Sequence, residues 1–360
     1  MKTLRLSVDP AHIETDAAQA AIAQAAQILR SGGLVALPTE TVYGLGANAL
    51  DHAAVARIFA AKQRPSWDPI IVHVAGPVHN NPMLEPLLAK CPPVVYELME
   101  AFWPGPLTLL LPRSAAVPDI VTAGRPLVGI RMPAHPVAFE VIRQAGVPVA
   151  APSANVFSHI SPTTAAHVLE DLDGKIDAII DAGPTRHGVE STVLDPTQSP
   201  MMIYRPGAVT AQQIREIAGP VVYFEEGMMP LAAAPEALPS PGVGLRHYAP
   251  RARLILVEGT LDELPARLAD AAGRHAKDRL GVMLPAELAP TRFEPPLRQA
   301  AEFAWGHWNA PEELAERLYA GLRALDAGGC TVILCPIPEG EGVGVAIRDR
   351  LRKAARSAQD

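Results

Sequence analysis

Residues 31–46 read SGGLVALPTETVYGLG, and this stretch decides the fold class. Before it, an alanine-rich run from Asp16 to Arg30 favours a helix that Gly32 and Gly33 would end. After the glycines, the apolar residues 34–37 predict a buried strand. A helix, a glycine cap and a buried strand in this order are typical of an α/β fold.

The same alternation continues along the chain. Further helices are expected at 51–64, 135–145, from Ser161, where Pro162 would take the first helical position, and at 210–219. Further strands are expected at 69–74, 107–111, 127–131, 147–151, 178–181, 191–195 and 201–205. Beyond residue 250, strands at 254–257, 280–284 and 331–336 alternate with helices from 260, from 311 to 327 and from 344. We therefore predict a first α/β domain at 1–215, an interdomain linker at 216–250 and a smaller α/β domain at 251–360.

Composition excludes several classes of protein. A net charge of −7 argues against a protein that coats nucleic acid, because such binding requires many cations. No apolar run approaches the roughly 18 residues of a membrane span, and Asp and Glu occupy the N-terminal region where a signal peptide needs apolar residues, so we expect a cytoplasmic protein without membrane contact. The spacing of the three cysteines and of the histidines fits no metal site, so no direct protein ligand for a metal is predicted.

Polar side chains follow the strand at 34–37. Thr39, Glu40 and Thr41 stand together where ligands of open α/β sheets bind, although a simple glycine turn is the alternative explanation for this stretch. No GxxxxGK[ST] motif is present, and no GxGxxG motif precedes a helix with an acidic partner. A P-loop nucleotidase and a dinucleotide-binding fold are therefore poorly supported.

Cations and small polar residues end other predicted elements. Lys62 and Arg64 close the helix at 51–64, where they would also complement the helix dipole. Arg131 and Arg205 finish apolar strands, and an arginine there can hold a carboxylate or a phosphate with two hydrogen bonds, or form a structural ion pair. Hydroxyl and amide groups follow the strand at 147–151 and precede the one at 191–195, and such groups suit phosphate oxygens.

Together these segments resemble the YrdC/Sua5 family, in its long two-domain Sua5 form. The motifs occur in the family's order and are PTETVYGLG (38–46), KQRP (62–65), PIIVH (69–73), WPGPLT (103–108), RMPAHP (131–136), APSAN (151–155), SPT (161–163), GVEST (188–192), RPG (205–207), SPG (240–242) and RHYAP (246–250). GVGVAIRDRLRKAA, from residue 342, resembles the end of the family's C-terminal domain.

The resemblance implies a fold and an activity. The fold would be a twisted, mixed sheet with helices and a concave active-site face, followed by a smaller Rossmann-like α/β domain. The rigid turn residues and hydrogen-bonding side chains of 240–250 also predict that the linker folds over the active site. The activity would be synthesis of L-threonylcarbamoyladenylate from L-threonine, bicarbonate and ATP, with release of pyrophosphate. Mg²⁺ would accompany ATP. The product would pass to the tRNA threonylcarbamoyltransferase machinery for t6A modification, and weak binding of tRNA is a further expectation.

The resemblance also assigns the site residues. The catalytic group is Lys62, Arg64, Ser153 and Asn155. The threonine pocket is Thr41, His73, Arg131, Ala151 and Ser191, and Arg131 is expected to hold the carboxylate. The residues that would contact ATP are Arg64, Asp68, Leu127, Ser153, Ser161, Arg205 and His247.

Three positions depart from the family pattern. Asp68 stands where many relatives have asparagine, Phe157-Ser158 replaces the usual Ser-Gly, and Val243-Gly244-Leu245 replaces the usual Met-Lys-Tyr.

Two other functions remain open. An RNA-binding module is opposed by the acidic charge and by an aromatic content of 5%. A carbamoyl-adenylate-forming protein of hydrogenase maturation would carry acylphosphatase and zinc-finger regions with cysteine pairs, which are not visible in this sequence.

Overall fold

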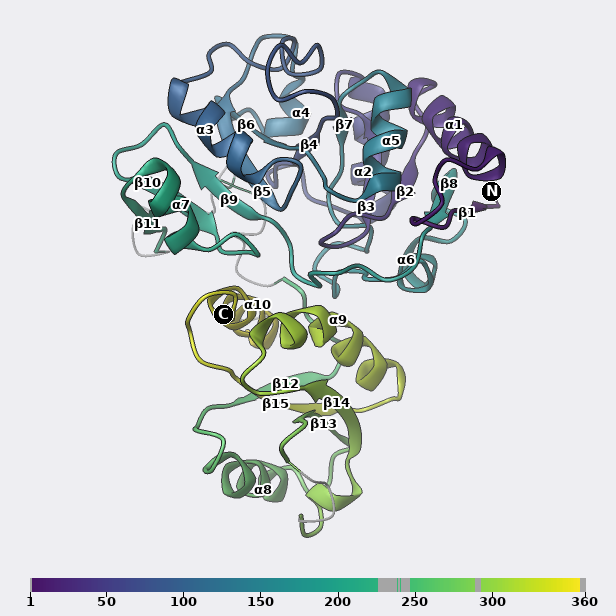
Figure 1. The fold of residues 1–360 in the computed structure, drawn as a ribbon. Coiled ribbons are helices and arrows are strands. Elements are labelled where there is room, and N and C mark those ends of the chain that lie inside the picture. Colours follow the sequence, from purple (N-terminus) through teal and green to yellow (C-terminus); the bar gives the residue numbers. More distant parts are fainter. Residues whose placement is uncertain (1, 226–237, 239, 241–246, 289–292, 357–360) are drawn as a thin grey trace. The chain divides into compact units, whose positions relative to one another are not determined.

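The computed structural model describes residues 2–225, 238, 240, 247–288 and 293–356. The chain divides into two compact units (Figure 1). The first contains Met1–Phe157, Pro162–Arg186 and Glu190–Gly244, and the second contains Ser158–Ser161, His187–Val189 and Leu245–Asp360. Two short loops of the N-terminal half are therefore grouped with the C-terminal part of the chain.

A mixed sheet runs through the first unit. Its eleven strands among the described residues are β1 (Leu4–Ser7), β2 (Val35–Leu37), β3 (Gly44–Asn48), β4 (Val72–His73), β5 (Leu107–Pro112), β6 (Leu127–Arg131), β7 (Val149–Ala150), β8 (Ala178–Asp181), β9 (Thr192–Asp195), β10 (Met201–Arg205) and β11 (Val221–Tyr223). Their order is β1-β8-β2-β3-β7-β4-β6-β5-β9-β10-β11. It contains parallel pairs such as β4–β6 and antiparallel pairs such as β2–β3, which confirms the predicted mixed α/β fold.

Helices cover this sheet, and polar side chains cap the first turn of four of them. They are α1 (Asp16–Arg30), α2 (His52–Lys62), α3 (Pro93–Phe102), α4 (Asp119–Thr122), α5 (Pro136–Ala145), α6 (Ala165–Leu172) and α7 (Ala211–Ala218). Thr15 caps α1, and the Asp51 carboxylate accepts hydrogen bonds from the amides of Ala53 and Ala54 at the start of α2. Such caps satisfy N–H groups that have no partner within the helix. The Asp51 cap fixes α2, whose last residue is Lys62.

Two local predictions were wrong. The stretch after Leu37 is not only a loop, because Gly44–Asn48 forms β3 antiparallel to β2. Glycine is needed at 46, where an added Cβ would lie 2.9 Å from the Val149 side chain. The helix expected from Ser161 begins at Ala165 instead, because the Thr164 side chain accepts the amide of His167 and provides the cap. The loop after Asn155 therefore reaches residue 164 without a helix.

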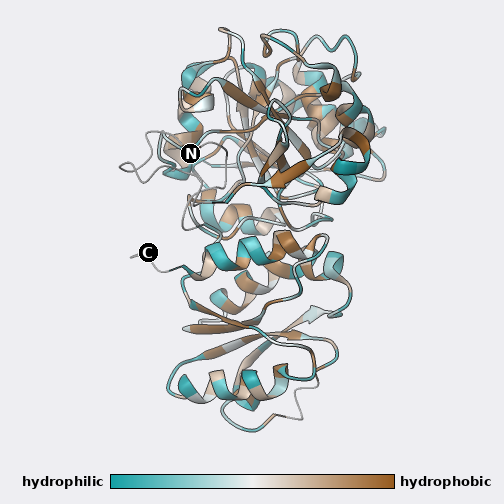
Figure 2. Cartoon of the chain, turned by 90° about the vertical axis from the view of Figure 1, so that its left-hand side faces the viewer, coloured by the Kyte–Doolittle hydropathy of each residue, from teal (hydrophilic) through white to brown (hydrophobic). Residues whose placement is uncertain are grey.

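The second unit contains a four-stranded parallel sheet. Its elements are β12 (Arg253–Val257), α8 (Leu264–Arg274), β13 (Leu280–Pro285), the 3-10 turn η3 (Leu297–Gln299), β14 (Ala301–Gly306), α9 (Pro311–Ala327), β15 (Val332–Pro336) and α10 (Gly344–Ala355). The strand order is β12-β15-β13-β14, with α9 and α10 on one face and α8 on the other (Figure 1). The strands are predominantly hydrophobic, as expected for a sheet covered on both faces (Figure 2). This smaller α/β domain agrees with the prediction.

The predicted linker at 216–250 overlaps ordered elements at its start. Helix α7 ends at Ala218, and β11 pairs in parallel with β10. Residues 226–237, 239 and 241–246, including the departure at Val243-Gly244-Leu245, lie outside the described residues. Within the part of the chain that the model describes, no helix has the length and apolar character needed to cross a membrane.

Candidate active site

Three neighbouring strands bring the predicted threonine residues together. His73 of β4 pairs with Arg131 of β6 on one side and with Val149 of β7 on the other. Beyond β7, the amide of Ala151 donates to the Ile71 carbonyl over 2.9 Å. The pairing register therefore places His73 and Arg131 side by side in the middle of the sheet, next to the segment that leads to Ser153.

Arg131 is the centre of a buried polar cluster. Its Nη2 lies 2.6 Å from Glu40 Oε1, its Nη1 donates to Thr41 Oγ1 over 2.9 Å, and its Nε donates to the Gly105 carbonyl over 3.1 Å. The Thr39 hydroxyl donates to the Val42 carbonyl and lies 2.9 Å from Thr41 Oγ1. Because the Thr39 proton is used in the bond to Val42, the Thr41 hydroxyl donates to Thr39, and Thr41 also accepts from Arg131. The chain after β2 thus holds the Arg131 guanidinium in one orientation.

Burial and Arg131 determine the charges of this cluster. Burial alone would raise the pKa of Glu40, but the adjacent Arg131 outweighs it and holds the pKa below the usual value, so Glu40 is an anion. Burial, reinforced by the positive charge of Arg131, lowers the pKa of His73 to about 3. Burial likewise lowers the pKa of His135 to about 4. Both imidazoles are therefore neutral near pH 7, and the buried charges of Glu40 and Arg131 cancel.

Ser191 is held by a second arginine. Arg205 donates from Nε and Nη2 to the Ser191 carbonyl over 3.1 and 3.0 Å, and from Nη2 to Ser191 Oγ over 3.1 Å. Ser191 Oγ also lies 2.8 Å from Thr108 Oγ1. Either of these two hydroxyls can donate to the other. Arg205 and Ser191 therefore form one rigid unit at the ends of β9 and β10.

Lys62 is almost completely buried at the end of α2, with 1% of its surface exposed. Its Nζ donates to the Ser153 carbonyl over 2.5 Å and to the Asn155 carbonyl. Burial, followed by the nearby charge of Arg64, holds the pKa of Lys62 well below its usual value of 10.5. Two N–H donors of the Lys62 side chain are used by backbone carbonyls. Lys62 thus fixes the Ser153–Asn155 segment to α2.

Arg64 lies beside Lys62 and is paired with Asp68. Arg64 Nη2 is 2.9 Å from Asp68 Oδ2, and both side chains are buried, with 6% and 0% exposed. Arg64 also donates to the carbonyls of Asp68 (3.1 Å) and Pro69 (2.6 Å), and its guanidinium carbon lies 6.0 Å from the centre of the Phe157 ring. Burial raises the pKa of Asp68, while Arg64, Lys62 and Arg205 oppose this rise. The positive charges of Arg64, Lys62 and Arg205 therefore all act on the Asp68 carboxylate.

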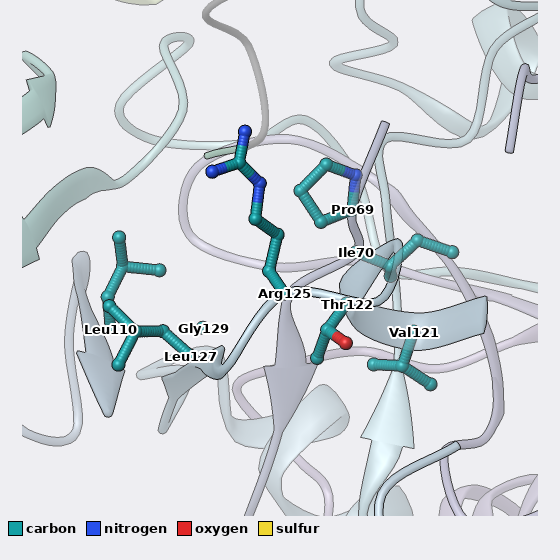
Figure 3. Close-up of a pocket in the computed structure, with 8 residues that line it drawn as sticks. All are labelled: Pro69, Ile70, Leu110, Val121, Thr122, Arg125, Leu127 and Gly129. Atoms are coloured by element: carbon teal, nitrogen blue, oxygen red, sulfur yellow. The ribbon is translucent and has the colours of Figure 1, made fainter. Parts of the chain in front are cut away.

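An apolar pocket begins where the Arg64 contact ends. It is small, with a volume of about 10 Å³ that is room for about one water molecule, and Figure 3 shows Leu110 and Leu127 on one side and Val121 and Thr122 on the other. The remaining lining residues are Pro69, Ile70, Arg125 and Gly129. Thr122 Oγ1 is buried and accepts or donates no hydrogen bond within the described ranges. The pocket thus combines apolar walls with one hydroxyl whose hydrogen bonds are available to a ligand.

The structure brings most of the predicted site residues together in the first unit. These are Thr41, Lys62, Arg64, Asp68, His73, Leu127, Arg131, Ala151, Ser153, Asn155, Ser191 and Arg205. Ser161 and His247 are grouped with the second unit, where the ring of His247 lies 5.4 Å from that of Tyr248. The nucleotide contacts expected of these two residues stay predictions. No group of three His, Cys, Asp or Glu side chains that could hold a metal occurs in the residues that the model describes.

The predicted site set did not include Glu40, His135, Thr108 or Thr122. Glu40 had the clearest signal, since it stands between two threonines directly after a buried strand. The other three are ordinary residues of a strand or helix in the sequence, and their place in the site depends on contacts with distant segments. Glu40 and Arg131, for example, lie on segments 91 positions apart and meet at 2.6 Å.

Comparisons with known proteins agree with this geometry. Residues 27–207 match the Sua5/YciO/YrdC family model, described as telomere recombination, and residues 209–356 match the model described as the C-terminal domain of threonylcarbamoyl-AMP synthase. A Bacillus subtilis protein named threonylcarbamoyl-AMP synthase is 42% identical over 99% of this chain and 98% of its own length. A Pyrococcus abyssi protein of the same name is 41% identical over 92% of this chain and 93% of its own length.

Solved structures give the same result. P. abyssi Sua5 complexed with L-threonine is 39% identical, has a TM-score of 0.85, and covers 99% of this chain and 98% of its own. Escherichia coli YciO, at 23% identity and a TM-score of 0.50, shares the fold over 59% of this chain and 98% of its own. Since both family models match in order and full-length relatives exceed 40% identity, this chain belongs to the Sua5/YciO/YrdC family in its two-domain Sua5 form.

Proposed function

We propose that this chain is an L-threonylcarbamoyladenylate synthase, which joins L-threonine, bicarbonate and the AMP part of ATP and releases pyrophosphate. The relatives that carry the name threonylcarbamoyl-AMP synthase support the reaction. The observation that carries the proposal is a pair of adjacent sites. The Glu40–Arg131 cluster can receive an amino acid. The second site contains the cations Lys62, Arg64 and Arg205, whose charges all act on Asp68, and it borders the apolar pocket.

The chemistry requires two bonds to form. The amine of threonine loses a proton and attacks the carbon of bicarbonate or CO2, which gives a carbamate and, from bicarbonate, water. A carbamate oxygen then attacks the α-phosphorus of ATP, the α–β phosphoanhydride bond breaks, and pyrophosphate leaves. Such phosphoryl chemistry depends mainly on alignment and on stabilisation of negative charge. The protein supplies alignment with fixed side chains and stabilisation with arginines.

Threonine would occupy the Arg131 cluster. The guanidinium has five N–H donors, and the three contacts described above leave donors for a substrate carboxylate. Thr41 and Ser191 offer hydroxyls, and the neutral His73 presents Nδ1, which has no hydrogen-bond partner among the described side chains and backbone. Ala151, whose Cβ faces Gly44, would limit the size of the pocket.

ATP would extend from Arg64 into the apolar pocket. The adenine ring would lie against Leu127 at the opening of this pocket, and the pocket would have to widen before the buried Thr122 hydroxyl could bond to the ring. The phosphates would then lie near Arg64 and Arg205. Ser153 would contact them from the segment that Lys62 holds in place.

Mg²⁺ would arrive with ATP and neutralise charge on its phosphates. No side chain of this chain is assigned as a direct ligand, because the Asp68 carboxylate is fully buried and already paired with Arg64. The ligands of the ion would be phosphate oxygens and water. We further propose that the product passes to the tRNA threonylcarbamoyltransferase machinery in the cytoplasm.

Pyrophosphate release tests the proposed function. We expect release from ATP only when threonine and bicarbonate are both present, because only their carbamate provides the nucleophile. Serine lacks one methyl group, a difference typically worth about 1 to 3 kcal/mol in a pocket, so it should react more slowly than threonine. A coupled pyrophosphate assay with each component omitted in turn measures this. Full release without threonine or without bicarbonate would refute the reaction.

A further inference from the structure

Glu40 is a buried anion at the centre of the threonine site, and the family resemblance assigns it no role. Its side chain is 6% exposed, and Oε1 lies 2.6 Å from Arg131 Nη2. The second oxygen, Oε2, is also buried and accepts no side-chain hydrogen bond from the described residues, while the backbone N–H groups of Glu40 and Ala134 help to lower the pKa of the carboxylate. A carboxylate buried in this way gains from a further donor, which a ligand can supply.

The charges around Glu40 sum to zero in the buried part of the site. Arg131 contributes one positive charge and Glu40 one negative charge, while burial keeps His73 and His135 neutral near pH 7. Arg186, which acts on His135 at a distance, is exposed to solvent. Thr39 and Thr41 add only hydroxyls. The site therefore presents one positive and one negative group side by side, with no net charge.

This arrangement matches one class of ligand. A free α-amino acid carries an ammonium and a carboxylate on the same carbon, so its two charges are also close together and also cancel. We propose that Glu40 makes this pocket selective for a zwitterion: it orients Arg131 for the substrate carboxylate and accepts the substrate ammonium with Oε2. The proposal rests on the proposed function, because it concerns the threonine site of that reaction.

A purely structural ion pair is the alternative. In that case Glu40 would only fix the loop after β2 and the Arg131 side chain, as the contacts of Arg131 with Thr41 and Gly105 also do. Removing its charge would then disturb the pocket for every ligand to a similar extent. The two explanations differ in how affinity changes for a ligand that has the carboxylate but not the ammonium.

The test compares L-threonine with (R)-3-hydroxybutyrate, which has the same carbon chain and hydroxyl but no amine. Calorimetry on the full chain would measure both affinities for the wild type and for Glu40→Gln, which keeps the shape and removes the charge. We expect threonine to bind at least 10-fold more weakly to Glu40→Gln, and 3-hydroxybutyrate to bind as well as before or more tightly. Parallel loss of both affinities, or no loss for threonine, would overturn the proposal.

Two further variants keep the test decisive. Glu40→Asp retains the charge and should bind threonine within a few-fold of the wild type. The double variant Glu40→Gln/Arg131→Gln replaces the ion pair by two neutral amides and serves if the single variant unfolds. It should bind both ligands weakly and without preference, and a retained preference for threonine would refute the role of Glu40. A wild type that does not bind threonine would instead refute the proposed function as well.

Discussion

Replacing Arg64 by alanine should lower kcat/KM for ATP by about 100- to 1,000-fold, which is the usual effect of deleting a donor that stabilises transition-state charge. Arg64 follows the end of α2 by two residues, and its guanidinium donates to the carbonyl of Pro69, which lines the apolar pocket. A phosphate group of ATP that binds the Arg64 guanidinium would lie next to Asp68. Steady-state kinetics with varied ATP measure the loss.

The loss of an ion-pair partner for Asp68 makes the Arg64→Ala variant alone difficult to interpret. Asp68 is fully buried and paired with Arg64, so Arg64→Ala leaves a buried charge without this partner, a change that typically costs about 3 to 5 kcal/mol of stability. Asp68→Asn removes that charge and restores the amide that many family members carry. We therefore expect Arg64→Ala/Asp68→Asn to melt close to Asp68→Asn alone, while its kcat/KM stays about 100-fold below that of Asp68→Asn. Recovery of activity in the double variant would show that Arg64 acts only on stability.

Replacing Lys62 by methionine should lower kcat/KM by about 100-fold and change the pH dependence of stability. Lys62 Nζ bonds to the carbonyls of Ser153 and Asn155, so its loss frees the segment that would contact the phosphates. Methionine has a similar length and keeps the buried volume filled. Lys175→Met, at an exposed lysine, is the matched control and should leave activity unchanged.

The sign of the pH effect follows from proton binding. The unfolded chain keeps the Lys62 proton up to pH 10.5, whereas the folded chain releases it at a lower pH because burial and Arg64 lower the pKa. Between these two pH values the unfolded state binds more protons, so stability rises with pH. Lys62→Met removes this contribution. Urea unfolding from neutral pH to pH 10 should show a smaller rise for Lys62→Met than for the wild type, and equal slopes would contradict the lowered pKa.

Secondary structure was best predicted where residues within the segment itself determine the start and end of the element. Helix α9, at Pro311–Ala327, has the predicted bounds because Pro311 starts it and Gly328 follows it. Strand β3 was missed because two of its five residues are glycines, which are uncommon in strands, and its pairing with β2 and β7 comes from the tertiary fold. The start of α6 was misplaced because two plausible caps, Ser161 and Thr164, lie three residues apart.

The candidate site was likewise predicted only as far as local sequence patterns allow. Motifs placed Lys62, Arg64 and Arg131 in the site, because cations at element ends beside polar loops are visible in the sequence. What these groups contact was not visible. Lys62 bonds to carbonyls more than 90 positions away, and Arg131 is balanced by Glu40 across the sheet. Such partners depend on strand order, which no local pattern specifies.

The mass of the product made from ¹³C-bicarbonate tests the central claim most directly. ATP, L-threonine and labelled bicarbonate are incubated with the full chain, and the adenylate is identified by mass spectrometry before it hydrolyses. The account predicts threonylcarbamoyl-AMP that is one mass unit heavier than with unlabelled bicarbonate, because the carbamoyl carbon comes from bicarbonate. Formation of unlabelled threonyl-AMP, or of AMP and pyrophosphate with no threonine-containing adenylate, would contradict it.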